Sequence, residues 1–129
     1  EQAREFASVD YQRTMAIVAA VGEGDDEKII GVARYGEDVE DPDAGAETAV
    51  VVEDAYQGRG LGTILLYRLV TYAQKQGIHR LRATVHQSNA QILRFVRRSG
   101  LPTEQTLRDG VWDITLSLTD QDLPELDRK

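Results

Sequence analysis

The fold of this chain is decided by the stretch Gln57-Gly58-Arg59-Gly60-Leu61-Gly62, in which three glycines fall within five positions. An apolar run at residues 49–52 comes before it and predicts a buried strand. After it, large side chains recur at helical spacing, at Leu61, Leu65, Leu69 and Tyr72. A strand that ends in a glycine-rich turn and opens a helix directs free backbone N–H groups at one point, together with the positive end of the helix dipole. That point suits a phosphate or pyrophosphate, and the alternative is a tight turn with no ligand.

The length and composition of the chain limit what it can be. Its 129 residues suffice for one domain with a hydrophobic core, and we expect a single domain, residues 1–129. Its apolar runs fall short of the ~20 residues that span a membrane, and residues 1–5 lack the apolar segment of a signal peptide. The absence of cysteine excludes disulfides, thiolate metal sites and a cysteine acyl-enzyme, and it fits a cytoplasmic protein.

The charge of the chain bears on its partners. A net charge of −7 argues against nucleic acid, whose binding proteins need a basic surface, and it is compatible with a cationic amine substrate. Residues 37–45 are strongly acidic. We interpret them as a solvated loop, which could also help to attract a basic substrate.

The order of the predicted elements indicates an α/β domain with a mixed sheet. We expect strands at residues 15–21, 29–35, 47–53 and 81–85, and a long helix at 60–76. Ser88 or Asn89 can cap a second helix that ends near Ser99. The dipeptide Asp109-Gly110 predicts the turn of a last hairpin, formed by 103–107 and 111–118. Residues 1–11 are expected to form one or two helical turns, and residues 119–129 to be frayed.

The glycine stretch differs from the two common phosphate loops. A Walker loop needs a lysine, which does not follow Gly62, and the dinucleotide fingerprint needs glycine where this chain has Thr63. With its valine-rich strand, the spacing Gln57-x-x-Gly60-x-Gly62 resembles the acetyl-CoA signature of the GNAT superfamily of N-acetyltransferases. A second similarity is the run Asn89…Ile92…Phe95…Gly100-Leu101, which is typical of a family helix that asparagine opens and glycine ends.

The resemblance covers residues 11–118 and implies a fold. In the family, a mixed and mostly antiparallel sheet is splayed at the cofactor site, with helices on both faces. The family's first strand and most of its first two helices are not matched. We therefore expect a domain cut from a longer chain, because the sheet edge beside residues 15–21 would otherwise be bare.

Within the superfamily, two features are most like the protein-lysine acetyltransferases of the Pat type. They are Glu47-x-Ala49-Val50-Val51-Val52 before the glycines and Asp10-Tyr11…Met15-Ala16 near the start. This resemblance implies a protein acceptor with a reactive lysine, an acyl-CoA synthetase among the candidates. It also implies a fused regulatory domain, either a cyclic-nucleotide-binding domain or a synthetase.

The resemblance also implies how acetyl-CoA would be held. The N–H groups of the turn and first helical residues would receive the pyrophosphate, and the backbone of the preceding strand would pair with the pantetheine arm and face the thioester oxygen. Asn89 would bind the arm from the other side, and its alternative role is a plain helix cap. The expected cofactor-binding residues are Val50, Val51, Val52, Gln57, Gly58, Arg59, Gly60, Leu61, Gly62, Thr63 and Asn89.

Deprotonating the acceptor amine is the harder chemical step. A lysine with a pKa of about 10.4 costs roughly 4.6 kcal/mol to deprotonate at neutral pH, so a general base is needed. Glu47 is our candidate, because an acid is unusual in an apolar strand and because Pat-type enzymes have a glutamate there. The alternative is a glutamate that points into solvent at the strand end, and we interpret Glu53 as such a surface residue.

The general acid departs from the family pattern. Many members carry a tyrosine seven positions after the asparagine, and here that position is Val96. Tyr67 and Tyr72 are expected to pack on the first helix, so the thiolate would leave unprotonated or take a proton from water. We interpret His86 as a hydrogen-bonded bystander near the site and His79 as a turn residue. No cluster has the spacing of metal ligands, so no metal is predicted.

These features predict an N-acetyltransferase in which the amine attacks acetyl-CoA directly, within a ternary complex. Ping-pong kinetics would count against this mechanism. Three alternatives stay open: a small amine as the acceptor, a non-catalytic acyl-CoA sensor, and an interaction domain without a ligand. The presence of Glu47 favours the enzyme over the sensor.

Overall fold

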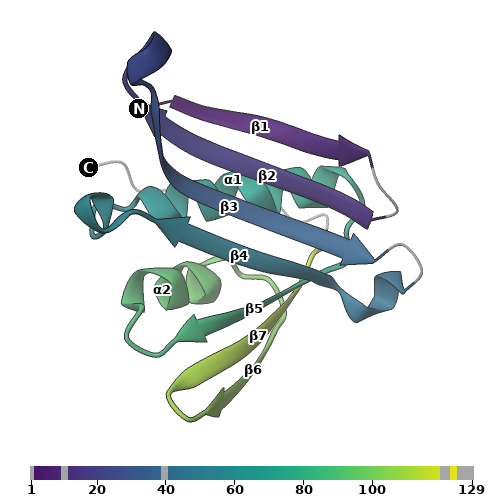
Figure 1. Ribbon diagram of the computed structural model, residues 1–129. Helices are drawn as coiled ribbons and strands as arrows, with labels where there is room; N and C mark the ends of the chain where they lie inside the picture. Colours follow the sequence, from purple (N-terminus) through teal and green to yellow (C-terminus); the bar gives the residue numbers. More distant parts are fainter. Residues whose placement is uncertain (1, 10–11, 39–40, 120–122, 125–129) are drawn as a thin grey trace.

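The computed structural model describes residues 2–9, 12–38, 41–119 and 123–124. Its strands and α-helices follow one another in an order close to the expected one, with one additional strand at the start (Figure 1). The strands are β1 (Gln2–Val9), β2 (Gln12–Val21), β3 (Lys28–Asp38), β4 (Ala46–Val52), β5 (Arg80–His86), β6 (Thr103–Arg108) and β7 (Val111–Ser117). The helices are α1 (Leu61–Lys75), between β4 and β5, and α2 (Ala90–Arg98), between β5 and β6. Neither helix is long and apolar enough to cross a membrane.

All seven strands belong to one mixed sheet, in the order β1-β2-β3-β4-β5-β7-β6. Every neighbouring pair is antiparallel except β4 and β5, which are parallel and are connected through α1. The last hairpin turns at Asp109 and Gly110, with φ of 53° and 79°. Positive φ at both central residues is what a two-residue hairpin loop requires, so the turn predicted from Asp-Gly is confirmed.

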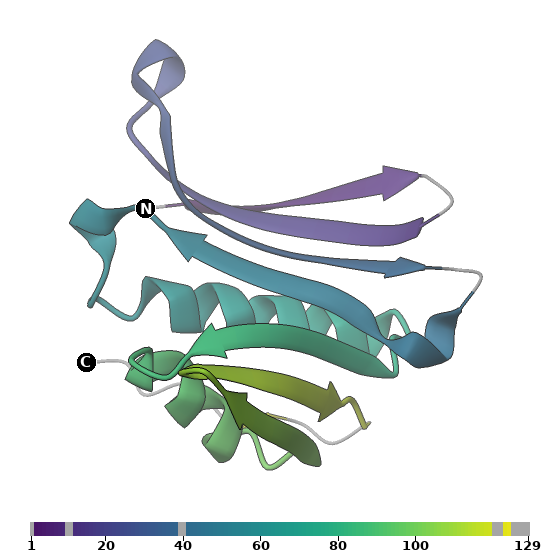
Figure 2. The ribbon, with the colours of Figure 1, turned by 60° about the horizontal axis from the view of Figure 1, so that its bottom comes forward.

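The parallel strands β4 and β5 pair only at their first residues. Their ladder contains two registers, Ala46 with Leu81 and Glu47 with Arg82. Beyond these, the strands diverge, as Figures 1 and 2 show. By contrast, β4 stays paired with β3 from Glu47 to Val52. The sheet is therefore splayed between β4 and β5, as the family resemblance predicted, and one edge of β4 carries no strand over most of its length.

Both helices pack on the same face of this sheet. The first helix buries Leu65, Leu69 and Val70, which are completely covered, against the central strands. The second buries Ile92, Phe95 and Val96 in the same continuous core. Side chains from both helices line a small apolar hollow of about 30 Å³ together with residues of β5 and β7. The fold class is confirmed, but the expectation of helices on both faces is wrong for the residues that the structure describes.

The opposite face, here called the outer face, is open to solvent along β4. Val51 is 66% exposed there, and Ala49 is exposed as well. The apolar run at 49–52 is therefore buried on one side only, in contrast to the fully buried strand that we predicted. The burial of β4 alternates along the strand because its inner side chains face the helices and its outer side chains face solvent.

Two other expectations are corrected. Residues 2–9 form strand β1 along the edge of β2, where we predicted helical turns and a missing first strand. The argument from a bare sheet edge therefore does not apply. Residues 37 and 38 continue β3, and the side chain of Glu37 is only 1% exposed, although we placed it in a solvated loop. The expected fraying of 119–129 falls mostly outside the described residues.

Candidate active site

The first turn of α1 keeps its backbone donors available. Gly60 is the residue before the helix, in the left-handed conformation with φ of 81°, and no side chain caps this end. Ile64 is the first residue whose N–H reaches back into the helix, donating to the carbonyl of Gly60 at 3.1 Å. The N–H groups of Leu61, Gly62 and Thr63 thus have no acceptor within α1. They form the kind of cluster that binds phosphate.

The glycines leave space around these donors. Gly58 and Gly60 both have positive φ, 79° and 81°, which L side chains rarely adopt. A Cβ atom placed on either glycine would have no heavy atom within 4 Å. The turn is therefore open on the side where side chains would otherwise project. This is the fit that a bulky anion such as a pyrophosphate requires.

Side chains around the turn hold it against β4. Gln57 donates through Nε2 to the carbonyl of Val52 at 2.9 Å and to Oδ1 of Asp54 at 3.1 Å. The structure thus gives the Gln57 side chain a scaffolding contact. The exposed guanidinium of Arg59 lies 5.4 Å from the ring centroid of Tyr56, so it stacks beside the turn.

The first turns of the two helices meet at β4. A Cβ placed on Gly62 would lie 3.6 Å from Val52, 3.7 Å from Val50 and 3.8 Å from Ile92 of α2. These are ordinary contact distances. The start of α1, the end of β4 and the start of α2 are therefore adjacent, and Asn89, which precedes α2, lies on the same side as the glycine turn. Cofactor-binding residues predicted from distant parts of the sequence are brought together here.

Asn89 is the N-cap of α2. Its Oδ1 accepts the backbone N–H of Ile92 at 3.3 Å. Its Nδ2 donors have no acceptor among the described residues and remain available. Just before it, Nδ1 of His86 accepts the N–H of Ser88 at 3.1 Å and lies 2.7 Å from the Ser88 hydroxyl. His86 is exposed and engaged locally, which agrees with its interpretation as a bystander.

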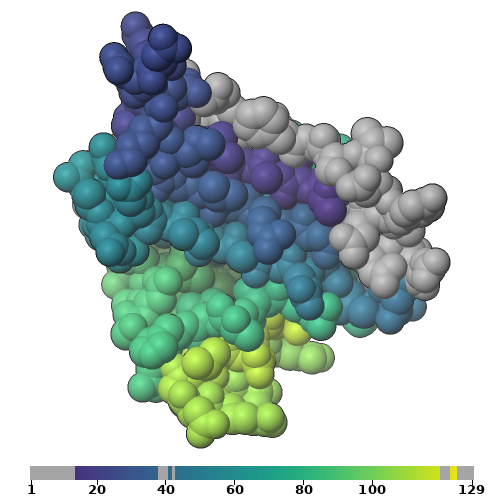
Figure 3. Space-filling model, in the orientation of Figure 1, coloured from purple at the N-terminus to yellow at the C-terminus, as the bar shows by residue number. Residues whose placement is uncertain are grey.

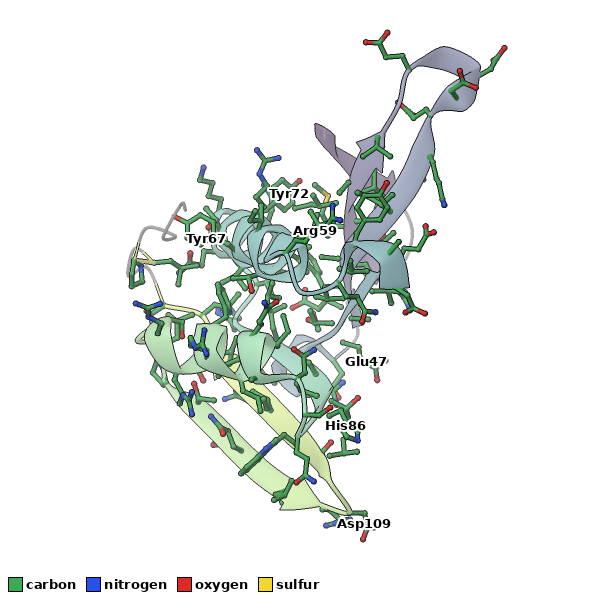
Figure 4. The ribbon with its side chains drawn as sticks, turned by 90° about the vertical axis from the view of Figure 1, so that its left-hand side faces the viewer. Glu47, Arg59, Tyr67, Tyr72, His86 and Asp109 are labelled. Carbon is green, nitrogen blue, oxygen red and sulfur yellow. The ribbon has the colours of Figure 1, made fainter. Side chains whose placement is uncertain are left out.

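Glu47 lies at the opposite end of the splay from the glycine turn. It occupies the last β4–β5 register, five residues before Val52, which corresponds to about 16 Å along a strand. Its side chain is 84% exposed on the outer face, and Oε1 lies 3.8 Å from Nη2 of Arg82. Figure 4 shows it directed away from both helices. In the space-filling view of this outer face, a furrow separates the teal of β4 from the green of β5 (Figure 3).

The remaining side chains that we singled out are placed as follows. Val96 is 4% exposed in the core, and Tyr67 and Tyr72 pack partly buried against that core, as expected (Figure 4). Glu53 is a surface residue, as expected, and its Oε1 accepts from Nζ of Lys28 at 2.7 Å. This hydrogen bond and charge raise the pKa of Lys28 above its ordinary value of 10.5.

Two residues near Glu47 were missed by the sequence analysis. Glu37 is buried on the helix side of β3, next to Gly36, whose partner on β4 is Glu47. The alternation Ala33, Tyr35, Glu37 was the available signal, since all three are buried. Arg82 is the second, and its position beside Glu47 depends on strand pairing, which single-strand patterns do not contain. In the described part of the chain, no three His, Asp or Glu side chains are grouped as metal ligands.

Several curated proteins resemble parts of this chain. It is 34% identical over 77 residues to an acetyltransferase of Pseudomonas aeruginosa, with 60% of this chain and 40% of that protein covered. It is 33% identical over 85 residues to acetyltransferase Pat of Mycolicibacterium smegmatis, with coverage of 64% and 23%. It is 35% identical over 75 residues to the L-methionine sulfoximine/L-methionine sulfone acetyltransferase of Pseudomonas aeruginosa, with coverage of 57% and 44%. The match thus spans less than half the length of each relative.

Solved structures have the same architecture. The GNAT domain of S. lividans PAT superposes with a TM-score of 0.57 at 25% identity, over 84% of this chain and 61% of that chain. A Salmonella typhimurium protein solved with its cofactor acetyl-CoA superposes with a TM-score of 0.59 at 23% identity, over 88% and 69%, which establishes likeness of fold alone.

A sequence model of the acetyltransferase (GNAT) family matches residues 3–101. This range contains β4, the glycine turn, both helices and the splayed strand pair, which are the elements that build the site. The chain belongs to the acetyltransferase (GNAT) family.

Proposed function

We propose that this chain is an N-acetyltransferase that uses acetyl-CoA and a primary amine, with a protein lysine side chain as the leading acceptor. The observation that carries the proposal is the arrangement along β4. Free helix donors lie at one end, an unpaired strand edge follows, and a carboxylate lies at the other end. An extended ligand with an anionic group at one end and a reactive group at the other matches this layout.

Different residues of the chain bind different parts of acetyl-CoA. The N–H groups of Leu61, Gly62 and Thr63 bind the pyrophosphate, and the helix dipole adds to their attraction. The edge of β4 that β5 leaves unpaired, from Thr48 to Val52, offers backbone donors and acceptors to the pantetheine arm, except for the Val52 carbonyl, which accepts from Gln57. The Nδ2 donors of Asn89 lie on the other side of the arm. When bound, acetyl-CoA supplies an acyl group activated as a thioester.

Glu47 acts at the end of the splay as the general base. It takes the proton of the acceptor ammonium, directly or through water, so that the amine nitrogen can bond to the acyl carbon while the carbon–sulfur bond breaks. A backbone N–H of β4 at the splay stabilises the negative charge on the carbonyl oxygen. Because Glu47 faces the outer side of the sheet, the acceptor approaches from that side, opposite the helices.

The choice of lysine rests on the similarity to Pat-type proteins, in sequence and in fold. A small amine is the second candidate, because a relative of comparable identity is an acetyltransferase whose name specifies a small molecule. A non-catalytic acyl-CoA sensor would have the same cofactor half, and Glu47 is the feature that favours the enzyme over it.

The test combines calorimetry with acetyl-CoA and an acetylation assay on a lysine peptide. In Glu47→Gln, acetyl-CoA should bind with the wild-type Kd, and kcat at neutral pH should fall roughly a hundredfold or more. Glu53→Gln is the matched control, because Glu53 also precedes the glycine turn but is paired with Lys28. This variant should keep the wild-type activity. Wild-type turnover by Glu47→Gln would exclude Glu47 as the base. If the wild-type protein binds acetyl-CoA but does not acetylate the peptide, lysine is excluded as the acceptor, and the small-amine acceptor and the non-catalytic sensor are favoured.

A further inference from the structure

Glu47 has a basic neighbour on each adjacent strand of the outer face. On β5, Arg82 occupies the register directly beside it. On β3, Arg34 is opposite Ala49, one step along the same face, and Gly36, with no side chain, is directly opposite Glu47. Both arginines are exposed. An approaching acceptor therefore meets one carboxylate, a position without a side chain at Gly36, and two guanidinium groups.

The contact between Glu47 and Arg82 is weak enough for a ligand to replace. Its distance of 3.8 Å is too long for a hydrogen bond, and the two side chains are 84% and 44% exposed. The nearby Arg80 is different, because its Nη1 already donates to the carbonyl of Asp43 at 3.0 Å. No described residue forms an ion pair with Arg34. The guanidinium groups of Arg34 and Arg82 are therefore both available to an anion.

We propose that the acceptor carries an anionic group next to its amine, and that Arg82, with Arg34 beside it, recognises this anion. The inference rests on the proposed acetyl transfer and specifies its substrate. An ammonium at Glu47 lies a few ångströms from Arg82, so a simple cation is attracted by one group and repelled by the other. A carboxylate close to the ammonium pairs with Arg82 and removes this conflict. The shared chemistry is found in a free α-amino acid and in a lysine that follows or precedes Asp or Glu.

Two matched acceptor pairs separate these sources. One pair is L-leucine and L-leucinamide, and the other is the blocked peptides Gly-Lys-Asp and Gly-Lys-Asn. The measurement is kcat/KM for each acceptor at saturating acetyl-CoA, for the wild-type protein, Arg82→Met and Arg34→Met. Arg68→Met, an equal loss of charge at an exposed position of α1, is the control.

The wild-type protein should prefer the anionic member of at least one pair by about fivefold, the effect of one partly exposed ion pair. That pair identifies the source of the anion. Arg82→Met should abolish the preference, because kcat/KM falls for the anionic acceptor, through KM, and does not fall for its neutral partner. Arg34→Met should reduce the preference less, and Arg68→Met should leave it unchanged.

Two results would overturn the inference while leaving acetyl transfer intact. One is equal wild-type rates within both pairs. The other is an equal loss on both members of a pair in Arg82→Met, which would mean that Arg82 acts only through Glu47. The absence of transfer to all four acceptors would instead overturn the proposed function, and this inference with it.

Discussion

The N-termini of the two helices lie beside each other, but only the N-terminus of α2 is capped by a side chain. At α1, glycine precedes the helix, no side chain caps it, and the first N–H groups face open space. At α2, Asn89 satisfies the N–H of Ile92, and His86 with Ser88 closes the turn before it. An internal cap stabilises a helix by typically about 1 kcal/mol. The absence of such a cap at α1 leaves its first N–H donors without a side-chain acceptor, so the α1 end is the one that we propose binds the anion.

The largest effect is expected when a carboxylate is placed in the α1 turn. Thr63→Glu adds a negative charge at the third helical position, where it competes with the pyrophosphate. Acetyl-CoA affinity should fall by about thirtyfold or more, while the free energy of unfolding rises by about 0.5 kcal/mol through the helix dipole. Calorimetry and urea unfolding measure the two quantities. Gln91→Glu makes the same change in the first turn of α2, and an equal loss of affinity there would refute the distinction between the two ends.

A methyl group at Gly60 tests the open space of the turn. Gly60→Ala should destabilise the protein by about 1–2 kcal/mol because of its positive φ, and it should weaken acetyl-CoA binding about tenfold. Gly77→Ala is the matched control, since Gly77 follows the other end of α1 with φ of 76° and equally open surroundings. It should lose similar stability and keep the wild-type Kd. If both variants bind acetyl-CoA equally well, the space at Gly60 is not used by the ligand.

The two roles of Asn89 can be separated by substitution. Asn89→Ser keeps a capping oxygen but removes the Nδ2 donors, whereas Asn89→Ala removes both. The alanine variant should lose about 1 kcal/mol of unfolding free energy, and the serine variant little. Both should bind acetyl-CoA about fivefold more weakly if the amide binds the arm. Wild-type affinity in Asn89→Ser would show that Asn89 is a cap and nothing more.

The smallest effect is expected at the Lys28–Glu53 pair, beside β4 but outside the splay. The pKa of Lys28 is raised in the folded protein by Glu53, so the pair stabilises the fold below pH 10.5 and this contribution disappears as pH rises through the higher folded pKa. The unfolding midpoint of the wild-type protein should fall between pH 9 and strongly alkaline pH, and the midpoint of Lys28→Met should fall less. Its acetyl-CoA affinity should equal that of the wild type, and a weaker affinity would extend the site to this pair.

Local signals predicted the parts of the fold that depend on neighbouring residues. The three glycines, followed by large apolar side chains at helical spacing, predicted α1, and Asn89 predicted the start of α2. Both predictions succeed because turn and cap preferences depend on a few neighbouring residues. Asp109 and Gly110 gave the last hairpin for the same reason. These elements hold most of the expected cofactor residues, so the positions of those residues in the fold were predictable from the sequence, and their binding of acetyl-CoA stays a prediction.

The rest depends on pairing between distant strands. Phe6 and Val9 are three residues apart, which favours a helical interpretation, yet β1 forms because the edge of β2 offers hydrogen bonds to it. An apolar run such as 49–52 does not say whether one face or two are covered. The proximity of Arg82 to Glu47 exists only through the β4–β5 register. Of the residues on the side of the site where we propose that the acceptor binds, the sequence therefore predicted Glu47 alone.

The most direct test of the account is amide NMR of the full chain titrated with acetyl-CoA. Saturable shifts are predicted for the N–H groups of Gly60, Leu61, Gly62 and Thr63 and along residues 48–52 of β4, with the β6–β7 turn at Asp109 and Gly110 unchanged. The amide of Ile92, already bonded to Asn89, should move less than those of the α1 turn. Saturable binding that leaves the amides of the α1 turn unshifted, or no binding at all, would contradict the proposal that the first N–H groups of α1 bind the pyrophosphate.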